Sequence, residues 1–276
     1  MTERLALIAG SGALVPEVIA AARLRGYELK LLTLGRRRDL RDLHPVPFSL
    51  AEPEAAVAAI REFGATCFVM AGGVSISDIA RERLSRFFRG AGRAAAPSVG
   101  DSGLSGLASD LARMTGARPM GVHEIAPELV APEGHLAGPE PSALQVETAM
   151  HALWLARKAG ALDLGQAVVV AGRRAIAAED IGGTDALLAR VRRFRRLGLA
   201  ADGDSPLVLA KCAKPDQPRF VDLPAIGPVT VAKARRSGIA VIAVEAGASI
   251  LIQKARLVAA ANAAGITLLG LAAPDA

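Results

Sequence analysis

The sequence predicts an α/β protein of two α/β domains, the first a Rossmann-like, doubly wound parallel sheet, joined to the second by a Pro/Gly-rich linker. Short apolar runs typical of buried strands alternate with longer segments of helical periodicity. Glycine-rich turns follow two of the predicted strands, as in nucleotide-binding sheets. The chain has 276 residues and is 51% hydrophobic, with Ala, Leu and Val prominent, which suits helices packed on a parallel sheet.

The first half opens with a strand, a turn and a helix. Residues 5–9 form an apolar run, Gly10-Ser11-Gly12 is the turn, and Pro16 suits the first turn of a helix that reaches about Arg25. The other elements predicted in this half are strands at 28–34, 66–71 and near 120–124, and helices at 53–63, 76–88 and 103–115.

Composition changes between residues 126 and 141, where six prolines and glycines occur within sixteen residues. We therefore predict a Rossmann-like N-terminal domain at 1–130, a linker at 131–142 and a C-terminal α/β catalytic domain at 143–276. The strands predicted in the second domain are 167–171, 207–210, 240–244 and 267–271, and the helices are 143–159, 184–197, 228–236 and 254–264.

Composition disfavours several classes of protein. Aromatic residues are 3% of the chain, which argues against platforms that stack bases or sugars. Cys67 and Cys212 are too few and too isolated for a disulfide scaffold or a structural zinc site, so we expect a reducing compartment. No apolar run approaches the ~18 residues of a membrane span, and the N-terminus lacks a signal-peptide pattern. We expect a cytoplasmic protein, with peripheral contact to the inner membrane left open.

Positive charge is concentrated in the second half. Residues 1–140 contain 16 basic and 16 acidic residues, whereas residues 141–276 contain 17 basic and 11 acidic residues and carry the whole net charge of +6. Five arginines punctuate the predicted helix 184–197 (Arg190, Arg192, Arg193, Arg195 and Arg196). A solvated helix face and a face that contacts anionic lipid both account for them. Nucleic acid is disfavoured, because no recognised module is present.

Two glycine turns in the first half are candidates for ligand contact. Gly10-Ser11-Gly12 opens a helix, where backbone N–H groups can face a phosphate. Gly72-Gly73 ends the third predicted strand, at the edge where open α/β sheets bind ligands. A dinucleotide fingerprint is incomplete, because Val15 replaces its third glycine and no acidic residue follows the second strand. Tight structural turns explain both segments as well.

The segment Gly182-Gly183-Thr184-Asp185 precedes a helix of the second half. Thr184 as an N-cap with Asp185 in the first turn is one interpretation. Presentation of N–H groups and the Thr184 hydroxyl to phosphate oxygens is the other.

The densest group of polar side chains follows the predicted strand 207–210. Lys211, Lys214, Asp216, Gln217, Arg219 and Asp222 lie in one long loop that ends at Gly227. Loops on a rigid sheet concentrate binding and catalytic groups. The lysines can neutralise phosphate, and Asp222 can bind Mg²⁺ or position a water.

At this loop the sequence resembles a family of two-domain bacterial enzymes, the UDP-2,3-diacylglucosamine pyrophosphatases of lipid A synthesis that are unrelated to calcineurin-like phosphoesterases. The resemblance is carried by Arg219-Phe-Val-Asp222-Leu223-Pro224-Ala225-Ile226-Gly227. It extends, in order, over 8–14, 71–75, 165–169, Glu179, 183–188, 209–211, Lys214-Pro215 and 243–247. It departs from the family pattern at Ser11, Ser102, Gly182 and Ala225, where other residues are usual.

The resemblance implies hydrolysis of UDP-2,3-diacylglucosamine to 2,3-diacylglucosamine 1-phosphate (lipid X) and UMP. It also implies Mg²⁺ dependence, a homodimer, and a lipid product held between the domains. Asp222 is the catalytic and metal-binding carboxylate by this resemblance. The residues expected to bind substrate are Gly10, Ser11, Gly12, Gly72, Gly73, Glu179, Gly183, Thr184, Asp185, Lys211, Lys214, Gln217, Leu223, Pro224, Gly227 and Glu245.

Two alternatives stay open at this point. The departures at Gly182 and Ala225 are compatible with a diverged relative that binds a UDP-sugar or lipid without turnover. The first glycine turn is compatible with a nicotinamide oxidoreductase, although its fingerprint is incomplete.

Overall fold

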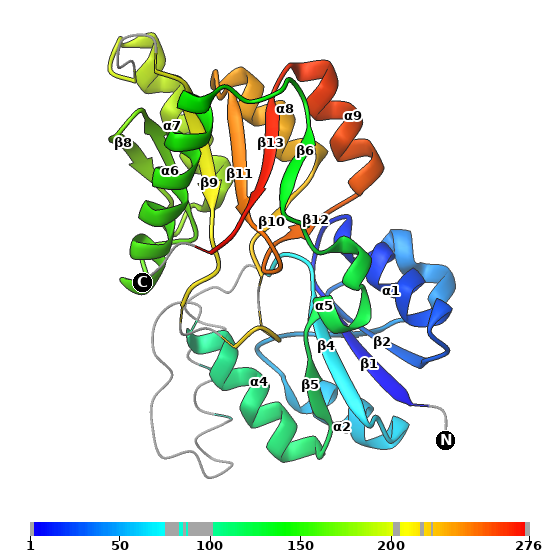
Figure 1. Ribbon diagram of the computed structural model, residues 1–276. Coiled ribbons are helices and arrows are strands. Elements are labelled where there is room, and N and C mark those ends of the chain that lie inside the picture. The colour runs from blue at the N-terminus through cyan, green and yellow to red at the C-terminus, as the bar shows by residue number, and fades with distance from the viewer. Residues whose placement is uncertain are drawn as a thin grey trace. The chain divides into compact units, whose positions relative to one another are not determined.

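The computed structural model describes residues 3–74, 83–84, 87, 102–200, 205–215, 218–221 and 223–273, with the side chains of 102–105 left out (Figure 1). These residues divide into two compact units. The first holds the described residues up to 128 together with 218–221, and the second holds the described residues within 129–215 together with 223–273. Most of the helix predicted at 76–88 and the residues Gln217 and Asp222 lie outside the described part of the chain.

The first unit contains a parallel sheet with the strand order β3-β2-β1-β4-β5. Its strands are β1 (Arg4–Ala9), β2 (Glu28–Leu34), β3 (Val46–Phe48), β4 (Cys67–Ala71) and β5 (Arg118–Met120). Its helices are α1 (Leu14–Leu24), α2 (Glu54–Phe63), α4 (Ser102–Thr115) and the short α5 (Val122–Ile125), with 3-10 turns η1 (Arg38–Leu43) and η2 (Pro127–Leu129). This strand order is that of a Rossmann-like sheet, which confirms the predicted class.

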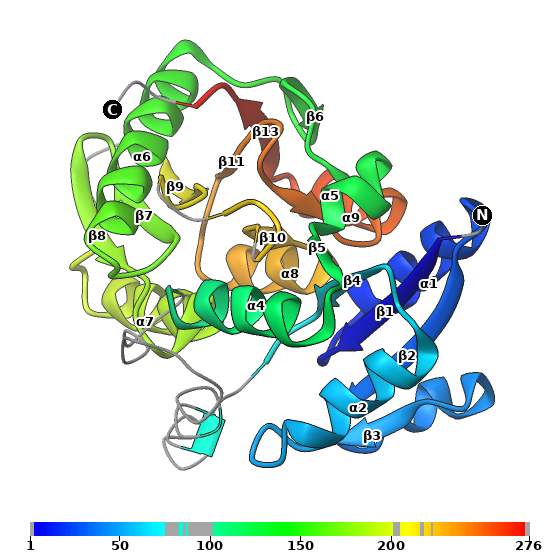
Figure 2. The same cartoon turned by 90° about the horizontal axis from the view of Figure 1, so that it is seen from below.

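Helices cover both faces of this sheet (Figure 2). Ala6 and Ile8 of β1 pack with buried residues of α2 and α4, and Val221 of the short segment 218–221 joins the same cluster. Because side chains alternate along a strand, Leu5 and Leu7 face the other side, where α1 contacts β1, β2 and β4.

The second unit contains a mixed sheet of the order β6-β13-β11-β9-β7-β8. The neighbours β9, β11 and β13 are parallel, whereas β6, β7 and β8 pair antiparallel. The strands are β6 (Gly134–Ala137), β7 (Ala167–Ala171), β8 (Arg174–Ala178), β9 (Leu207–Lys211), β11 (Val241–Glu245) and β13 (Thr267–Leu271). A separate parallel pair consists of β10 (Ala225–Ile226) and β12 (Ile250–Leu251).

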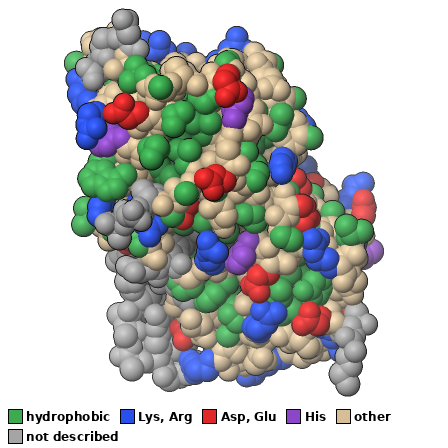
Figure 3. Space-filling view, viewed as in Figure 1, with side chains coloured by type: hydrophobic (Ala, Val, Ile, Leu, Met, Phe, Trp, Pro, Cys, Tyr) green, Lys and Arg blue, Asp and Glu red, His purple; other side chains and the backbone are tan. Residues whose placement is uncertain are grey.

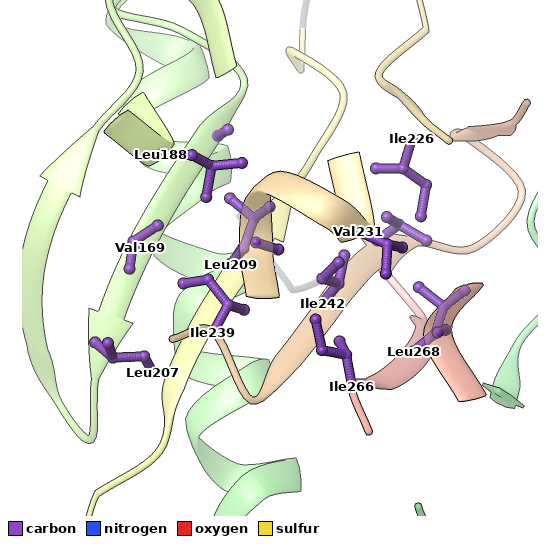
Figure 4. Packing of buried hydrophobic residues seen from close by; sticks show 14 of the residues in the cluster. Val169, Leu188, Leu207, Leu209, Ile226, Val231, Ile239, Ile242, Ile266 and Leu268 are labelled. Carbon is purple, nitrogen blue, oxygen red and sulfur yellow. The ribbon is translucent and has the colours of Figure 1, made fainter. Parts of the chain in front are cut away.

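Three helices pack on one face of the second sheet and one helix packs on the other. Figure 4 shows Leu209, Ile242 and Leu268 of the strands against Leu188 of α7 (Gly183–Arg196) and Val231 of α8 (Pro228–Arg236). Helix α9 (Lys254–Ala264) completes this layer. The opposite face packs against α6 (Ala143–Ala161), which leaves Met150 and Trp154 exposed. Figure 3 shows hydrophobic side chains gathered on that side of the second unit.

Local capping explains where α6 begins. The Ser142 hydroxyl accepts a hydrogen bond from the Gln145 backbone N–H, and the Gln145 side chain accepts one from the Ser142 N–H. This reciprocal capping box satisfies two N–H groups that a helix start leaves free.

The structure differs from the prediction at one predicted strand and at several strands that the sequence did not predict. The strand predicted near 120–124 is wrong beyond Met120, because Glu124 accepts a hydrogen bond from the Gly121 N–H and starts the short α5. The strands β3, β6, β8, β10 and β12 are absent from the prediction. Two of them pair antiparallel at the two ends of the second sheet, so β6 and β8 need no continuous apolar run to mark them.

Candidate functional site

The carboxyl ends of β9 and β11 carry two candidate residues of the second unit, Lys211 and Glu245. These strands are parallel neighbours, with Val244 opposite Lys211. Lys211 is the last residue of β9 and Glu245 the last of β11, and both are buried. Ligands of open α/β sheets bind at this edge.

Lys211 belongs to a chain of hydrogen bonds that joins three predicted site residues. Its ammonium donates to the Thr184 hydroxyl at 2.9 Å, and that hydroxyl donates to Glu179 Oε1 at 2.6 Å. Because an ammonium only donates, Thr184 must accept from Lys211, which leaves the hydroxyl proton for Glu179. The ammonium also donates to the Ala225 carbonyl at 3.3 Å. Two of its three N–H groups are thus engaged, and no residue that the structure describes accepts from the third.

The second carboxylate oxygen of Glu179 is bonded to the backbone just before β7. Its Oε2 accepts a hydrogen bond from the Gln166 backbone N–H at 2.8 Å. A Cβ at Gly165 would lie 2.7 Å from the Glu179 Cβ, so the glycine allows this close approach. Both carboxylate oxygens therefore have protein partners, and Glu179 orients Thr184 and, through it, Lys211.

Glu245 forms a second buried cluster at the same edge. Its Oε2 lies 2.9 Å from Cys212 Sγ and accepts a hydrogen bond from the Ala213 N–H at 2.9 Å. Burial, and then the hydrogen bond to this carboxylate, raise the pKa of the Cys212 thiol, which stays protonated. The Nη1 atom of Arg157, on α6, lies 4.0 Å from Glu245 Oε1. Among the described residues, the buried Nε of Arg157 has no hydrogen-bond partner.

The loop after Asp222 is anchored in the second unit. Leu223 and Pro224 are buried, and the Pro224 carbonyl accepts a hydrogen bond from the Ile250 N–H. The Gly227 N–H donates to the Thr230 hydroxyl at the start of α8. Asp222 itself and Gln217 lie outside the described residues, so their predicted roles stay predictions.

Three further predicted residues of the second unit have surroundings of their own. Lys214 forms an ion pair with Asp163. Asp185 pairs with Lys233 of α8. Gly183 has a φ of 72° and open space around its Cα.

In the first unit the two predicted glycine turns lie against each other. The Ser11 N–H donates to the Gly73 carbonyl at 2.8 Å, and the Gly73 N–H donates to the Ser11 carbonyl at 2.9 Å. Gly10 is buried, whereas Ser11, Gly12 and Gly73 are exposed. Arg37 donates to the Gly10 carbonyl, a contact that the sequence analysis missed because Arg37 follows the next strand.

Close packing of these turns requires glycine at position 10. A Cβ there would lie 2.4 Å from the Gly73 carbonyl oxygen, whereas Gly12, with a φ of 97°, has no atom within 4 Å of its Cβ position. We expect Gly10→Ala to lower the free energy of unfolding by about 1–3 kcal/mol through overpacking. Urea unfolding measures this loss, with Gly12→Ala as the control that adds only backbone strain. Equal losses in the two variants would contradict the steric explanation.

Metal ligands are not grouped in the part of the chain that the structure describes. No set of three His, Cys, Asp or Glu side chains there could hold a metal ion. Glu179 and Glu245 are both engaged by protein donors. The described residues alone therefore do not form a Mg²⁺ site, and we assign no reaction step to an ion.

Sequence reasoning missed two residues of the carboxyl edge, Arg157 and Cys212. Arg157 lies on a helix whose apolar residues dominate its pattern, and Cys212 has no motif of its own. Only the fold brings both to Glu245, which is 33 positions from Cys212.

A two-unit α/β protein with a buried lysine and a partly buried arginine at a carboxyl sheet edge is of the class whose ligands bind at that edge. Residues 4–129 match the model of the LpxI N-terminal domain, and residues 132–269 match that of the LpxI C-terminal domain. The chain is also 32% identical to the UDP-2,3-diacylglucosamine pyrophosphatase LpxI of Caulobacter vibrioides over 285 residues, covering 97% of each chain. The chain belongs to the LpxI family, which confirms the resemblance noted in the sequence.

Proposed function

We propose that this chain hydrolyses the pyrophosphate bond of UDP-2,3-diacylglucosamine in lipid A biosynthesis and releases 2,3-diacylglucosamine 1-phosphate and UMP. The observation that carries the proposal is the end-to-end match, over 97% of both chains, to a relative named for this pyrophosphatase. The buried cationic edge of the second unit supports it, because a diphosphate needs neutralising donors. Nothing in the comparisons favours a non-catalytic relative or a nicotinamide oxidoreductase.

The reaction requires water to attack one phosphorus while the bridging oxygen leaves with the other phosphate. The new bond joins the water oxygen to phosphorus, the bond to the bridging oxygen breaks, and a water proton is released. Most of the catalysis in such a reaction comes from positioning and from neutralising the phosphoryl oxygens.

Lys211 is the described residue best placed for this neutralisation. Thr184 and the Ala225 carbonyl fix its ammonium, so it is already oriented before an anion arrives. The guanidinium of Arg157, at the same edge, is a second donor, and no described residue accepts from its Nε–H. Glu179 and Glu245 act as positioning residues, because their carboxylates contact these donors or their neighbours.

Asp222 completes the proposed machinery by resemblance to the family loop. A carboxylate there would position the attacking water or bind Mg²⁺, whose chemistry when bound is to neutralise the phosphate oxygens. Gln217, Lys214 and the first-unit glycines are proposed substrate contacts on the same basis. A homodimer and transient contact with the inner-membrane surface are likewise proposals from the family resemblance and the basic helix face.

Assaying the purified wild-type chain on UDP-2,3-diacylglucosamine in mixed micelles tests the proposal. We expect UMP and the lipid 1-phosphate in equal amounts. Chelation should abolish UMP release and added Mg²⁺ should restore it, because the family resemblance implies Mg²⁺ dependence and a bound Mg²⁺ would neutralise the phosphate oxygens.

The outcomes separate the activity from its metal requirement. Thermal stabilisation by the UDP-lipid with no UMP would favour the non-catalytic alternative. Full activity after chelation would contradict Mg²⁺ dependence alone and leave the hydrolysis established.

A further inference from the structure

Helices α7 and α8 enclose a basic groove on the side of the second unit opposite α6. The groove has a volume of about 430 Å³ and we call it the α7–α8 groove. Its lining residues come from both helices and are Asp185, Leu188, Ala189, Arg192, Arg193, Arg196, Lys233, Arg236 and Ser237. Asp185 is among the residues expected to bind substrate by resemblance, and the proposed hydrolysis gives no role to the others.

Five cations and one carboxylate of the described residues line this groove. Asp185 pairs with Lys233, which removes one charge of each sign. Arg192, Arg193, Arg196 and Arg236 have no ion pair with any residue that the structure describes. By contrast, Arg190 on the same helix is paired with Asp180. Four arginines within about a Debye length repel one another, and an anion in the groove would relieve that repulsion.

The helix dipole explains only part of this arrangement. Cations in the last turn of a helix are favourable, which accounts for Arg196 on α7 and Arg236 on α8. The dipole does not account for Arg192, nor for the position of basic residues from both helices on one groove. Guanidinium groups form paired hydrogen bonds with phosphate oxygens, so the groove fits phosphate.

Exposed leucines follow α7 immediately after Arg196. Leu197 is 59% exposed and Leu199 is 58% exposed. A basic face bordered by exposed leucines is typical of surfaces that rest in the head-group region of an anionic membrane. The chain has 3% aromatic residues, which disfavours a nucleic-acid surface. No described helix is long and apolar enough to cross a membrane, so contact of the described residues with lipid would be superficial.

We propose that the α7–α8 groove binds the phosphate groups of anionic phospholipids and that Leu197 and Leu199 insert beside them. The groove thereby holds the protein on the membrane in which a diacylated substrate would reside. The link between membrane binding and a diacylated substrate rests on the proposed function, whereas the binding of anionic lipid does not.

Vesicle co-sedimentation of the full chain tests the proposal without turnover. We compare phosphatidylcholine vesicles with vesicles that contain ~30% phosphatidylglycerol, a charge density close to that of an anionic leaflet. The wild type should bind only the anionic vesicles and be released by about 0.5 M salt. The triple variant Arg192→Gln, Arg193→Gln, Arg196→Gln should bind them roughly 100-fold more weakly, since each basic residue contributes about fivefold.

A matched triple, Arg36→Gln, Arg38→Gln, Arg41→Gln, removes the same charge from exposed positions of the first unit and should bind as the wild type does. Leu197→Ser with Leu199→Ser should weaken binding by roughly tenfold or more at unchanged charge. Circular dichroism checks that every variant is folded.

Three results would overturn the proposal. Equal losses in the two arginine triples would show that net charge alone drives binding. If inorganic phosphate stabilised the protein and the protein did not bind vesicles, the groove would be a site for soluble phosphate. Binding of single-stranded DNA, lost in the groove triple, without vesicle binding would make it a nucleic-acid surface.

Discussion

Replacing Asp222 by alanine should leave the protein folded and lower UMP release by at least about 1000-fold, the scale expected when a metal-binding or water-positioning carboxylate is removed. The physical reason is that no other residue of the loop segment 219–227 carries a carboxylate that could bind a metal or position water at the phosphoanhydride. The measurement is the rate of UMP release at saturating UDP-2,3-diacylglucosamine, beside circular dichroism of the variant.

Asp216→Ala is the matched control for this prediction. It removes the same charge from the same loop, at a position that the family resemblance does not mark. We expect it to keep most of the activity. Near-normal UMP release by Asp222→Ala would refute the catalytic assignment of this carboxylate. A UDP-lipid that co-purifies with inactive Asp222→Ala would identify the substrate class directly.

Lys211→Met should reduce kcat by about 10²–10³-fold with a smaller change in KM, because a pre-oriented donor stabilises charge that develops in the transition state. Methionine keeps the length of the buried side chain and removes its charge and its hydrogen bonds to Thr184 and Ala225. Lys254→Met, at an exposed position of α9, is the control and should be close to wild type. An unchanged kcat for Lys211→Met would show that this ammonium does not contact the reacting phosphate.

The hydrogen bond from Lys211 to Thr184 allows a second check on the same role. Thr184→Val removes the hydroxyl that accepts from Lys211 and donates to Glu179, and it should lower kcat in the same direction. Thr184→Ser keeps both bonds and should restore most of the activity. If valine and serine variants were equally active, the orientation of Lys211 by Thr184 would not matter for turnover.

Much of the fold follows from local patterns in the chain. The apolar runs at 167–171 and 207–210 predict β7 and β9, because strands buried on both faces read as continuous apolar segments. The antiparallel strand β8 has no such apolar run and was not predicted, since its residues are only partly buried or exposed. The glycine motif at 10–12 was visible, but its need for Gly10 depends on Gly73, 63 positions away.

The candidate site shows the same division. Lys211 was found because it ends a strand in a polar loop, whereas Arg157 was missed because a helix of apolar pattern hides its contact with Glu245. The resemblance supplied Glu179 and Glu245 as residues of the site without saying what they touch. The structure assigns them to separate clusters, around Lys211 and around Arg157 and Cys212.

By itself, the amino-acid sequence determined the α/β class, the order of most elements, the basic second half and membership of a pyrophosphatase-like family, because periodicity, charge and motif spacing are properties of neighbouring residues. Only the tertiary structure decided that Lys211 meets Thr184, that Cys212 meets Glu245 and that arginines of α7 converge with those of α8. Such meetings depend on which strands pair and which helices pack, and those long-range contacts leave no periodic trace in the chain.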